Sequence, residues 1–475
     1  MTENQKSITT FVLTSGLLTE IFFLAFINYN GSTGNIPLYM FIYFESFLVM
    51  LITLFLIKKL DRDEPAVELS EENKKPGWFL RLFARILYFS QTDAHKLRTP
   101  LLLIFFGLIF RLTLLPAADT TSHDVNRYLW EGKILSHGYN PFITAPQDSQ
   151  LIKYRTRLYD DITYKNMVTI YPPISQMTFL SAYLLKGESI IGLKLIYLFL
   201  DLIIMFLLLK FLYLKNVDLN NIILYAWMPL ILMEFFVNVH IDLVGILFML
   251  LFIYFIEKNK IYSAAVFFSL AFLSKIYPVI LFPLVLKKAG LKRSLYFFLI
   301  FLVITFCAYF PFIYKDFSVF TSFFIYLKKW EFNSSIYLLL KHNYLNPEYS
   351  RLLCAGLFIL SVGVISILYK DFTKAAYGVF IAMIIFGTTL YPWYLGWIAS
   401  LNPLYNFYSV TSLLFTINFS NFSTLGTVWK EYLFVHLIEF VPFFALLIID
   451  VFIMWKHRIK RIAIKGKISP LGDKE

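Results

Sequence analysis

A carboxylate and a cation stand one helical turn apart in the largest polar segment of the chain. Asp124, Arg127, Tyr128 and Glu131 follow the spacing i, i+3, i+4 and i+7, so a helix beginning near Ser122 would present all four on one face. A neighbouring guanidinium keeps a carboxylate ionised and able to act as a base, and its planar fork also suits a phosphate. The spacing therefore indicates a base beside an anion site. The alternative is a surface ion pair between Asp124 and Arg127.

More ionisable residues interrupt later apolar runs. The string EFFVNVHIDLVG places Glu234, His240 and Asp242 at the outer end of two consecutive runs, where ionisable groups are costly and indicate function. His240 could contact a phosphate, and Asp242 could orient the imidazole or bind a cation, although His-x-Asp alone falls short of a metal site. LSKIYP places Lys275 at a break between two short runs, where half-helix ends and an ammonium make an anion site. A structural histidine and a lysine that only extends to the interface are the alternatives.

Aromatic side chains gather at the same predicted side of the chain. TIYPPISQ places Tyr171 before two prolines, which fix an extended backbone. KKWEFNSS contributes Trp330 and Asn333, and YPWYLGW contributes Trp393 and Tyr394. Tryptophan and tyrosine beside a polar cleft suit stacking against the apolar face of a sugar ring. The alternative is an interfacial aromatic belt, in which Trp130 would be one anchor.

Composition excludes a soluble globular enzyme. Of 475 residues, 58% are hydrophobic and only 16% are charged, whereas soluble domains are about 25% charged. Apolar runs of about 20 residues, the length that crosses a hydrocarbon core, recur along the chain. The runs are apolar on every side, so they predict an all-α polytopic membrane protein and argue against a barrel. The net charge of +12 is expected to mark cytoplasmic loops and not a nucleic-acid partner.

The apolar runs predict roughly ten to thirteen transmembrane or half-membrane helices. The third span leads into a large extracytoplasmic loop, residues 116–171, and most later Lys and Arg fall in short loops on the other side. Full spans are expected near residues 8–28, 37–57, 100–115, 190–209, 222–236, 241–256, 294–312, 352–368, 375–390 and 433–455. Half-helices are expected at residues 264–273, 277–286, 397–404 and 408–417. Asp201, Glu439 and Asp450 lie within apolar runs and are expected to form hydrogen bonds between helices.

Four regions follow from this map. Residues 1–58 form an N-terminal transmembrane hairpin, and residues 59–99 form a cytoplasmic linker that ends in an amphipathic segment, residues 78–90. That segment is either an interfacial helix or an ordinary cytoplasmic loop. Residues 100–420 form the membrane core with its loop, and residues 421–475 form a final span and a basic cytoplasmic tail.

Several of these strings, taken in order, resemble one family. DVNRYLWEGKILSHGYNPF with TIYPP after it, PLILMEF followed by HID, KIYP, KKWEFNSS and PWYLGW are similar to the motifs of bacterial polyprenol-phosphate-dependent glycosyltransferases of the GT-C superfamily, in the mannosyltransferase-like branch. The resemblance covers roughly residues 100–404 and leaves the first 99 residues unexplained. Glu131 stands where the family pattern WDG has aspartate, and HID stands where HND is usual.

The resemblance implies a multi-pass fold of GT-C type whose first large extracytoplasmic loop carries the catalytic aspartate. Asp124 matches that position, with Asp119 as the second candidate. It also implies a polyprenyl-phosphate-sugar donor, transfer of a hexose with mannose as the expected sugar, and inversion at the anomeric carbon. The acceptor is left open between a lipid, a glycan and a protein, and no cofactor is firmly implied, since a divalent cation is allowed but not required.

Together, the residues and the resemblance predict a site in the bacterial inner membrane that faces the extracytoplasmic side. Asp124 and Arg127 are the predicted catalytic residues, and Lys275, His240 and Arg127 are predicted to bind the donor phosphate. The predicted sugar and acceptor contacts are Tyr128, Trp130, Tyr171, Asp242, Trp330, Asn333, Trp393 and Tyr394, with no metal ligands assigned. A transporter or flippase of lipid-linked sugars is the main alternative. A non-catalytic membrane assembly subunit is a third.

Overall fold

The computed structural model describes residues 3–30, 34–62, 77–313, 318–425 and 429–467. Over these residues the chain is helical, and its one β-type contact is an isolated bridge between Phe332 and Thr389. The predicted all-α class is confirmed.

The first half of the described chain contains α1 (Glu3–Tyr29), α2 (Ile36–Arg62), α3 (Trp78–Ile86), η1 (Gln91–Leu97), α4 (Arg98–Thr113), α5 (Asp124–Ser136), η2 (Ser149–Tyr154), α6 (Arg157–Asp160), α7 (Pro173–Lys186), α8 (Ile191–Leu214), η3 (Leu219–Ile222), α9 (Ile223–Ala226), α10 (Pro229–Phe236) and α11 (Asp242–Glu257). The second half contains α12 (Ile261–Ser274), η4 (Tyr277–Leu281), α13 (Phe282–Ala289), α14 (Leu291–Tyr309), η5 (Phe310–Phe312), η6 (Ser318–Phe320), α15 (Thr321–Lys329), α16 (Ile336–Asn343), α17 (Pro347–Leu368), α18 (Phe372–Phe386), η7 (Pro392–Leu395), α19 (Gly396–Ala399), α20 (Asn402–Tyr405), α21 (Tyr408–Thr416), η8 (Ile417–Thr424) and α22 (Leu433–Lys467).

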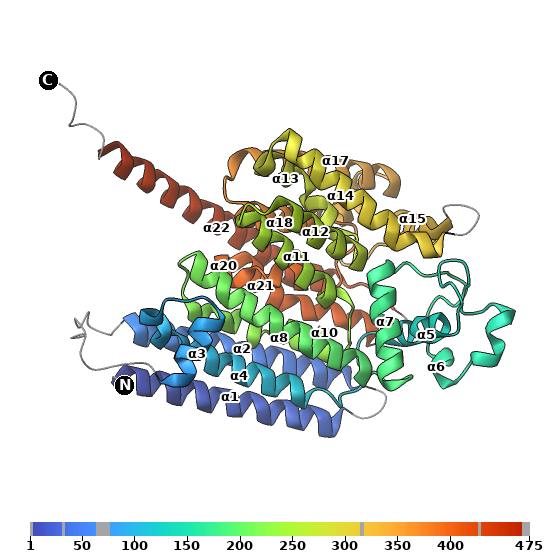
Figure 1. Ribbon diagram of the computed structural model, residues 1–475, viewed down its shortest axis with the longest axis horizontal. Coiled ribbons are helices and arrows are strands. Elements are labelled where there is room, and N and C mark those ends of the chain that lie inside the picture. The colour runs from blue at the N-terminus through green and yellow to red at the C-terminus, as the bar shows by residue number, and fades with distance from the viewer. Residues whose placement is uncertain (1–2, 31–33, 63–76, 314–317, 426–428, 468–475) are drawn as a thin grey trace.

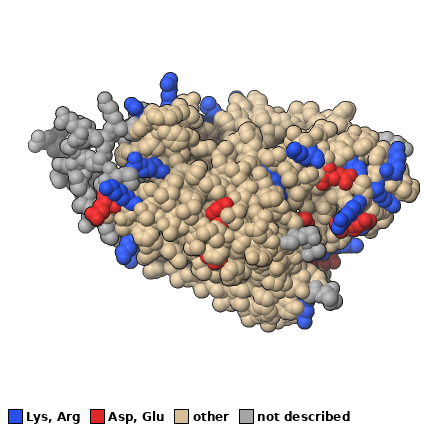
Figure 2. Space-filling view, turned by 90° about the horizontal axis from the view of Figure 1, so that it is seen from below, with Lys and Arg blue, Asp and Glu red and all other residues tan. Residues whose placement is uncertain are grey.

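Six of the described helices are long and apolar enough to cross a membrane: α1, α2, α8, α14 with η5, α17 and the first part of α22. One pair of helices, Leu219–Ala226 and Pro229–Phe236, meets the same criteria only when the two are taken together, and the pair is bent by 41°. The bend falls where Pro229 begins α10, because proline cannot donate the backbone hydrogen bond of a helix interior. The predicted half-helices are present as α12, η4 and α13, and as α19, α20 and α21. The molecule is therefore a multi-pass membrane protein, and the face in Figure 2 is uncharged over most of its area.

The helices lie in a stack in which the C-terminal helices α18, α20, α21 and α22 return to the middle, beside α8 and α11. Figure 1 shows α1 and α4 at the bottom, α8, α11 and α12 in the middle, and α14 and α17 at the top. The short helices α5 and α6 lie at the right of Figure 1, at the end of the stack opposite to the start of α1. Helix α5 packs closely on α7, since a Cβ on Gly132 would lie only 2.3 Å from the carbonyl oxygen of Phe179.

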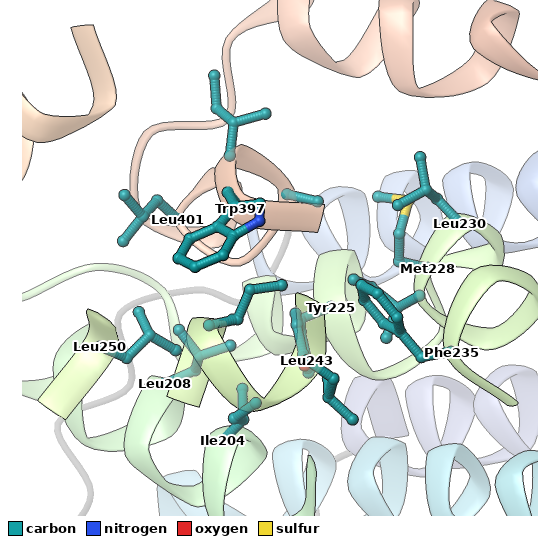
Figure 3. Packing of buried hydrophobic residues seen from close by; sticks show 14 of the residues in the cluster. Ile204, Leu208, Tyr225, Met228, Leu230, Phe235, Leu243, Leu250, Trp397 and Leu401 are labelled. Atoms are coloured by element: carbon teal, nitrogen blue, oxygen red, sulfur yellow. The ribbon is translucent and has the colours of Figure 1, made fainter. Parts of the chain in front are cut away.

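Trp397 of α19 is fully buried in the hydrophobic core. Figure 3 shows its indole beside side chains that include Tyr225 and Leu243, from α9 and α11. A Cβ on Gly245 would lie 2.5 Å from Cη2 of Trp397, so the glycine leaves room for the ring. This close fit brings the indole Nε1 within 2.8 Å of Asp242 Oδ1, to which it donates a hydrogen bond.

One ion pair is fully buried between the helices. Arg111 of α4 pairs with Asp201 of α8, and Tyr225 of α9 donates to the other oxygen of Asp201 at 2.5 Å. The guanidinium also donates to the carbonyl oxygens of Gly107 and Ala226, at 2.8 and 2.7 Å. Asp201 therefore joins helices, as expected.

Glu439 and Asp450 also make the contacts expected of residues within apolar runs. Glu439 accepts from Asn333 at 2.6 Å, and Asp450 accepts from the hydroxyl of Ser409 at 2.7 Å. Both carboxylates lie on α22 and reach segments outside it, so they tie the last helix to the bundle.

The predicted amphipathic segment forms α3, on which Trp78, Phe79, Leu82 and Ile86 are exposed. An exposed apolar face on a short basic helix is typical of an interfacial helix. Residues 63–76 of the predicted linker, and residues 468–475 of the predicted tail, lie outside the described residues.

Candidate active site

A cavity of about 440 Å³ lies beside α5. Its walls come from residues within the stretches 121–128, 163–172, 275–277, 323–332, 391–394 and 420–429, which are far apart in the sequence. The predicted site residues among them are Asp124, Arg127, Tyr128, Tyr171, Lys275, Trp330, Trp393 and Tyr394. The fold therefore brings together most of the residues singled out from the sequence.

Asp124 is the first residue of α5 and faces the cavity. The helix begins two residues after Ser122, whose hydroxyl accepts from the Asp124 amide at 3.4 Å. The Asp124 side chain is 34% exposed. Burial raises its pKa above the ordinary value, and the carboxylate of Asp242 adds to this, whereas Lys275 and Arg127 act in the opposite direction. A carboxylate with a raised pKa is a stronger base when ionised.

Lys275 faces the same cavity from the end of α12. The helix ends at Ser274, and the extended backbone of Lys275 projects its ammonium to 2.7 Å from Asp242 Oδ2. The ammonium also lies over the ring of Tyr394, 4.8 Å from its centroid. A half-buried cation held at a helix break is suited to an anionic group in the cavity.

Asp242 does not line the cavity, contrary to its predicted role in sugar or acceptor binding. It is fully buried at the start of α11, and its two oxygens accept from Lys275 and from Trp397. Both oxygens are thus engaged by protein donors. Asp242 holds Lys275 in place and balances its charge.

Arg127 is engaged differently from the sequence prediction. Its Nε donates to Glu131 Oε1 at 2.6 Å, and its Nη1 and Nη2 donate to the carbonyl oxygens of Tyr164 and Met167, at 3.3 and 2.7 Å. The pairing of Arg127 with Asp124 that the spacing predicted is replaced by this set. The Arg127 guanidinium therefore links α5 to Tyr164 and Met167, which line the cavity.

Glu131 completes a buried network behind the cavity wall. Its Oε2 accepts from Thr169 at 2.7 Å and from Gln176 at 2.6 Å. This network links α5 with Thr169, which precedes α7, and with Gln176 of α7, so Arg127 and Glu131 together support the cavity wall.

His240 lies behind the cavity wall and not in it. Its ring is fully buried and stacks on Trp393, with centroids 3.7 Å apart. The stack continues from Trp393 to Tyr391 at 4.5 Å and from Tyr391 to Phe332 at 4.5 Å. Trp393 thus separates His240 from the cavity, so the predicted direct contact of His240 with a phosphate is not supported. The imidazole instead lies near Asp124, with Nδ1 3.9 Å from Oδ2.

Two predicted sugar contacts point elsewhere. Trp130 is fully buried in a small core of the loop with Leu151 and Ile162, because it projects from a different face of α5 than Asp124 does. Asn333 is buried, and its amide donates to Glu439. The structure therefore places neither Trp130 nor Asn333 among the residues that line the cavity.

Aromatic residues that line the cavity contact one another in two pairs. Tyr128 and Tyr171 meet edge to face at 5.0 Å, and Tyr128 also stacks on Phe179, which lies behind the lining, at 4.6 Å. In the second pair, the Tyr394 hydroxyl lies 2.5 Å from the hydroxyl of Tyr326.

Several lining residues were missed by the sequence reasoning. Tyr326 lies in an apolar stretch of α15 before Lys328 and Lys329, and the polar residues of η8, such as Asn421, lie in a segment without a charge. His123 was also missed, although it precedes Asp124 directly. Its Nδ1 lies 2.7 Å from Asp119 Oδ2, and this hydrogen bond raises the pKa of the imidazole. Within the described part of the chain, no three His, Cys, Asp or Glu side chains are grouped so that they could hold a metal ion.

Comparison with known proteins gives one match. Residues 79–289 match the model of a family described as alpha-(1->6)-mannopyranosyltransferase, N-terminal domain. The matched part includes α5, the segment up to α7, and Lys275. No curated protein and no solved structure shows significant similarity to the chain.

Proposed function

We propose, from the match of residues 79–289 to the alpha-(1->6)-mannopyranosyltransferase N-terminal domain, that this glycosyltransferase transfers mannose from a polyprenyl-phosphate-linked donor. The acceptor receives the sugar in the cavity beside α5. The proposal rests on one observation above all: Asp124 and Lys275, about 150 residues apart in the sequence, face the same aromatic-lined cavity. A base and a cation at one sugar-sized cavity suit attack on an anomeric carbon that bears a phosphate.

In this mechanism Asp124 removes the proton of an acceptor hydroxyl as that oxygen attacks the anomeric carbon. The bond between that carbon and the phosphate oxygen breaks, and the electron pair leaves with the phosphate. Lys275 stabilises the charge on the leaving phosphate, and Asp242 keeps the ammonium in position. Attack from the face opposite to the leaving group inverts the anomeric configuration. General-base help of this kind is worth about 10²–10⁴ in rate.

We assign the reaction to the extracytoplasmic side. The cavity lies beside α5, and α5 lies at the end of the stack opposite to the start of α1. The basic pair Lys58 and Lys59 lies near the end of α2, and the positive-inside rule assigns such residues to the cytoplasm. The hairpin of α1 and α2 then has both ends inside, and the cavity faces outward.

The test is sugar transfer by purified protein in proteoliposomes. Polyprenyl phosphates that carry mannose, glucose or arabinose are offered as donors. Asp124→Asn should lower transfer of mannose by at least 10² while donor binding and thermal stability stay near those of the wild type. Asp119→Asn is the matched control, because Asp119 carries the same charge nearby but is engaged by His123, and it should retain most of the activity.

Undiminished transfer by Asp124→Asn would contradict the proposal. Movement of intact donor across the bilayer without transfer would instead support a transporter of lipid-linked sugars.

A further inference from the structure

A short row of buried polar groups leads away from Asp124 into the bundle. Beyond Asp124, the imidazole of His240 comes next, and its Nε2 lies 3.5 Å from Glu234 Oε2. His240 is fully buried, and neither ring nitrogen makes a hydrogen bond to the described residues. A buried ring without partners costs free energy, so its placement between two carboxylates calls for a functional reason.

The backbone before His240 is strained. Val239 has φ of 60°, which is rarely adopted by a β-branched residue. Such strain costs free energy and persists only where the surroundings impose it, often at functional sites. At this position it directs the imidazole between Asp124 and Glu234, while Trp393 covers the ring with a stacking contact at 3.7 Å.

Glu234 is held firmly on its far side. The Tyr39 hydroxyl donates to Glu234 Oε1 at 2.8 Å, and Asn238 Nδ2 donates to Oε2 at 3.2 Å. Asn238 also donates to the Thr121 hydroxyl at 2.7 Å and accepts from the amide of Thr120 at 3.1 Å. The same amide side chain therefore fixes both Glu234 and the loop that leads to Asp124.

We propose that Asp124, His240 and Glu234 form a carboxylate–imidazole–carboxylate unit that shares the proton taken from the acceptor, with Tyr39 positioning Glu234. This inference rests on the proposed function. His240 and Glu234 are positioning residues, since they act through Asp124 and do not line the cavity.

The proton balance of this unit needs no further reactant. With Glu234 ionised, the imidazole directs its Nε2–H to Glu234 and its Nδ1 lone pair to Asp124. When Asp124 takes the acceptor proton, its new O–H donates to Nδ1, so the proton is shared instead of resting on a lone carboxyl group. The separation of 3.9 Å must shorten in that state, as catalytic hydrogen bonds often do on substrate binding. Asp124 later returns the proton to water through the cavity. Glu234 orients the imidazole of His240 in this unit, as the buried carboxylate orients the histidine of a catalytic triad.

The unit also gives a role to the N-terminal hairpin. Tyr39 lies on α2, outside the residues that match the family domain. From the same hairpin, Asn30 donates to the hydroxyl of Thr120 at 3.2 Å and to the carbonyl oxygen of Ala118 at 3.4 Å. The hairpin therefore supports both ends of the unit: Glu234 directly, and Asp124 through the loop before α5.

The test compares Glu234→Gln, Tyr39→Phe and Tyr43→Phe in the sugar-transfer assay. Glu234→Gln keeps the shape and removes the charge, so kcat should fall at least tenfold while the donor KM stays within twofold. Tyr39→Phe should cause a smaller loss in the same direction. Tyr43→Phe is the matched control, because Tyr43 lies one turn along α2 and donates to Leu414 instead of Glu234.

A pH profile separates this role from a merely structural one. Loss of the Glu234 charge should make Asp124 easier to ionise, so the acid limb of kcat/KM should move to lower pH. The other charged groups that act on Asp124 are Lys275, Asp242, Arg127 and His123. Lys275 also faces His240, and Asp242 and the buried Tyr39 and Tyr43 face Glu234. A His123→Asn background removes the titration of the imidazole next to Asp124.

Wild-type kcat and an unmoved acid limb in Glu234→Gln would overturn the inference, provided that Asp124→Asn remains inactive. If Asp124→Asn is active, the proposed function itself fails. If Glu234→Gln does not fold, Tyr39→Phe provides the test. A lowered kcat together with a shift in the acid limb of the kcat/KM profile would support the proposed unit. A kcat and a pH profile like those of Tyr43→Phe would refute it.

Discussion

Two buried ion pairs in this molecule differ in what surrounds them. Arg111 and Asp201 pair within the helix stack, where both side chains are fully buried and Tyr225 adds a further hydrogen bond. Lys275 and Asp242 pair at the edge of the cavity, where the lysine side chain is 18% exposed and lies between aromatic rings. The first pair is enclosed by α4, α8 and α9, whereas the second has one open side.

The difference shows how structural and functional charges can be told apart in a membrane protein. A charge inside the bilayer is costly in either place, so burial alone does not distinguish them. The enclosed pair leaves no room for a ligand and can only hold helices together. The open pair presents a cation to a cavity that also contains Asp124.

The largest effect is expected from breaking the enclosed pair. Arg111→Met leaves Asp201 buried without its cation, which should lower the free energy of unfolding by about 3–5 kcal/mol. Thermal unfolding in detergent measures the loss. The protein that remains folded should transfer sugar at a nearly normal rate, because Arg111 is not among the residues that line the cavity.

The double variant Arg111→Met with Asp201→Leu is the control for that prediction. Replacing both charges leaves no unpaired ion, so much of the lost stability should return. A double variant no more stable than the single one would show that the pair is not enclosed in the way described.

A smaller and different effect is expected from the open pair. Lys275→Met should raise the donor KM at least tenfold, equivalent to about 1.4 kcal/mol of binding, because the phosphate loses its cation. Stability should fall less than in Arg111→Met, since Asp242 keeps the hydrogen bond from Trp397. Initial rates at varied donor concentration give the KM.

Lys133→Met is the matched control for Lys275→Met. Lys133 is also a lysine with little exposure in an ion pair, but it pairs with Glu188, and neither residue lines the cavity. An unchanged donor KM in Lys275→Met, or an equal rise in Lys133→Met, would contradict the role of Lys275.

Much of the architecture could be predicted from the sequence because a membrane imposes a simple length requirement. Apolar runs located the six long helices, and the breaks near Lys275 and Asn406 correctly divided short helices, whereas the spans expected near residues 100–115, 241–256 and 375–390 are helices of only 15 or 16 residues. Helical spacing also predicted α5 and the position of Asp124 at its start. These features depend on local sequence, so a single chain is enough to show them.

Contacts between distant segments could not be predicted in the same way. The spacing of Arg127 pointed to Asp124, but Glu131 lies on the next turn and competes for the guanidinium. Trp130 is on the same helix as Asp124, yet it faces a different core. The contact between Tyr39 and Glu234 joins residues 195 positions apart, and no periodicity in either helix indicates it.

The smallest effect is expected at a third pair, which lies near the surface. His123 and Asp119 pair at 2.7 Å, but the His123 side chain is 56% exposed. The hydrogen bond to Asp119 raises the pKa of His123 above its ordinary value of 6.5. The pair therefore adds stability that is fully present below pH 6.5 and is lost as the pH rises through the raised pKa. Because the pair is solvent-exposed, we expect His123→Gln to lower stability at pH 5.5 by less than about 1 kcal/mol.

Thermal unfolding of the wild type and His123→Gln across pH 5–9 checks this sign. The difference between them should shrink toward zero at the alkaline end, and Asp119→Asn should abolish the same pH dependence because it removes the partner. A difference that grows with pH would contradict the charged pair. A loss of stability in His123→Gln as large as that in Arg111→Met would mean that solvent exposure does not weaken the pair of His123 and Asp119. Burial would then not explain why the pair of Arg111 and Asp201 contributes more to stability than the other two pairs.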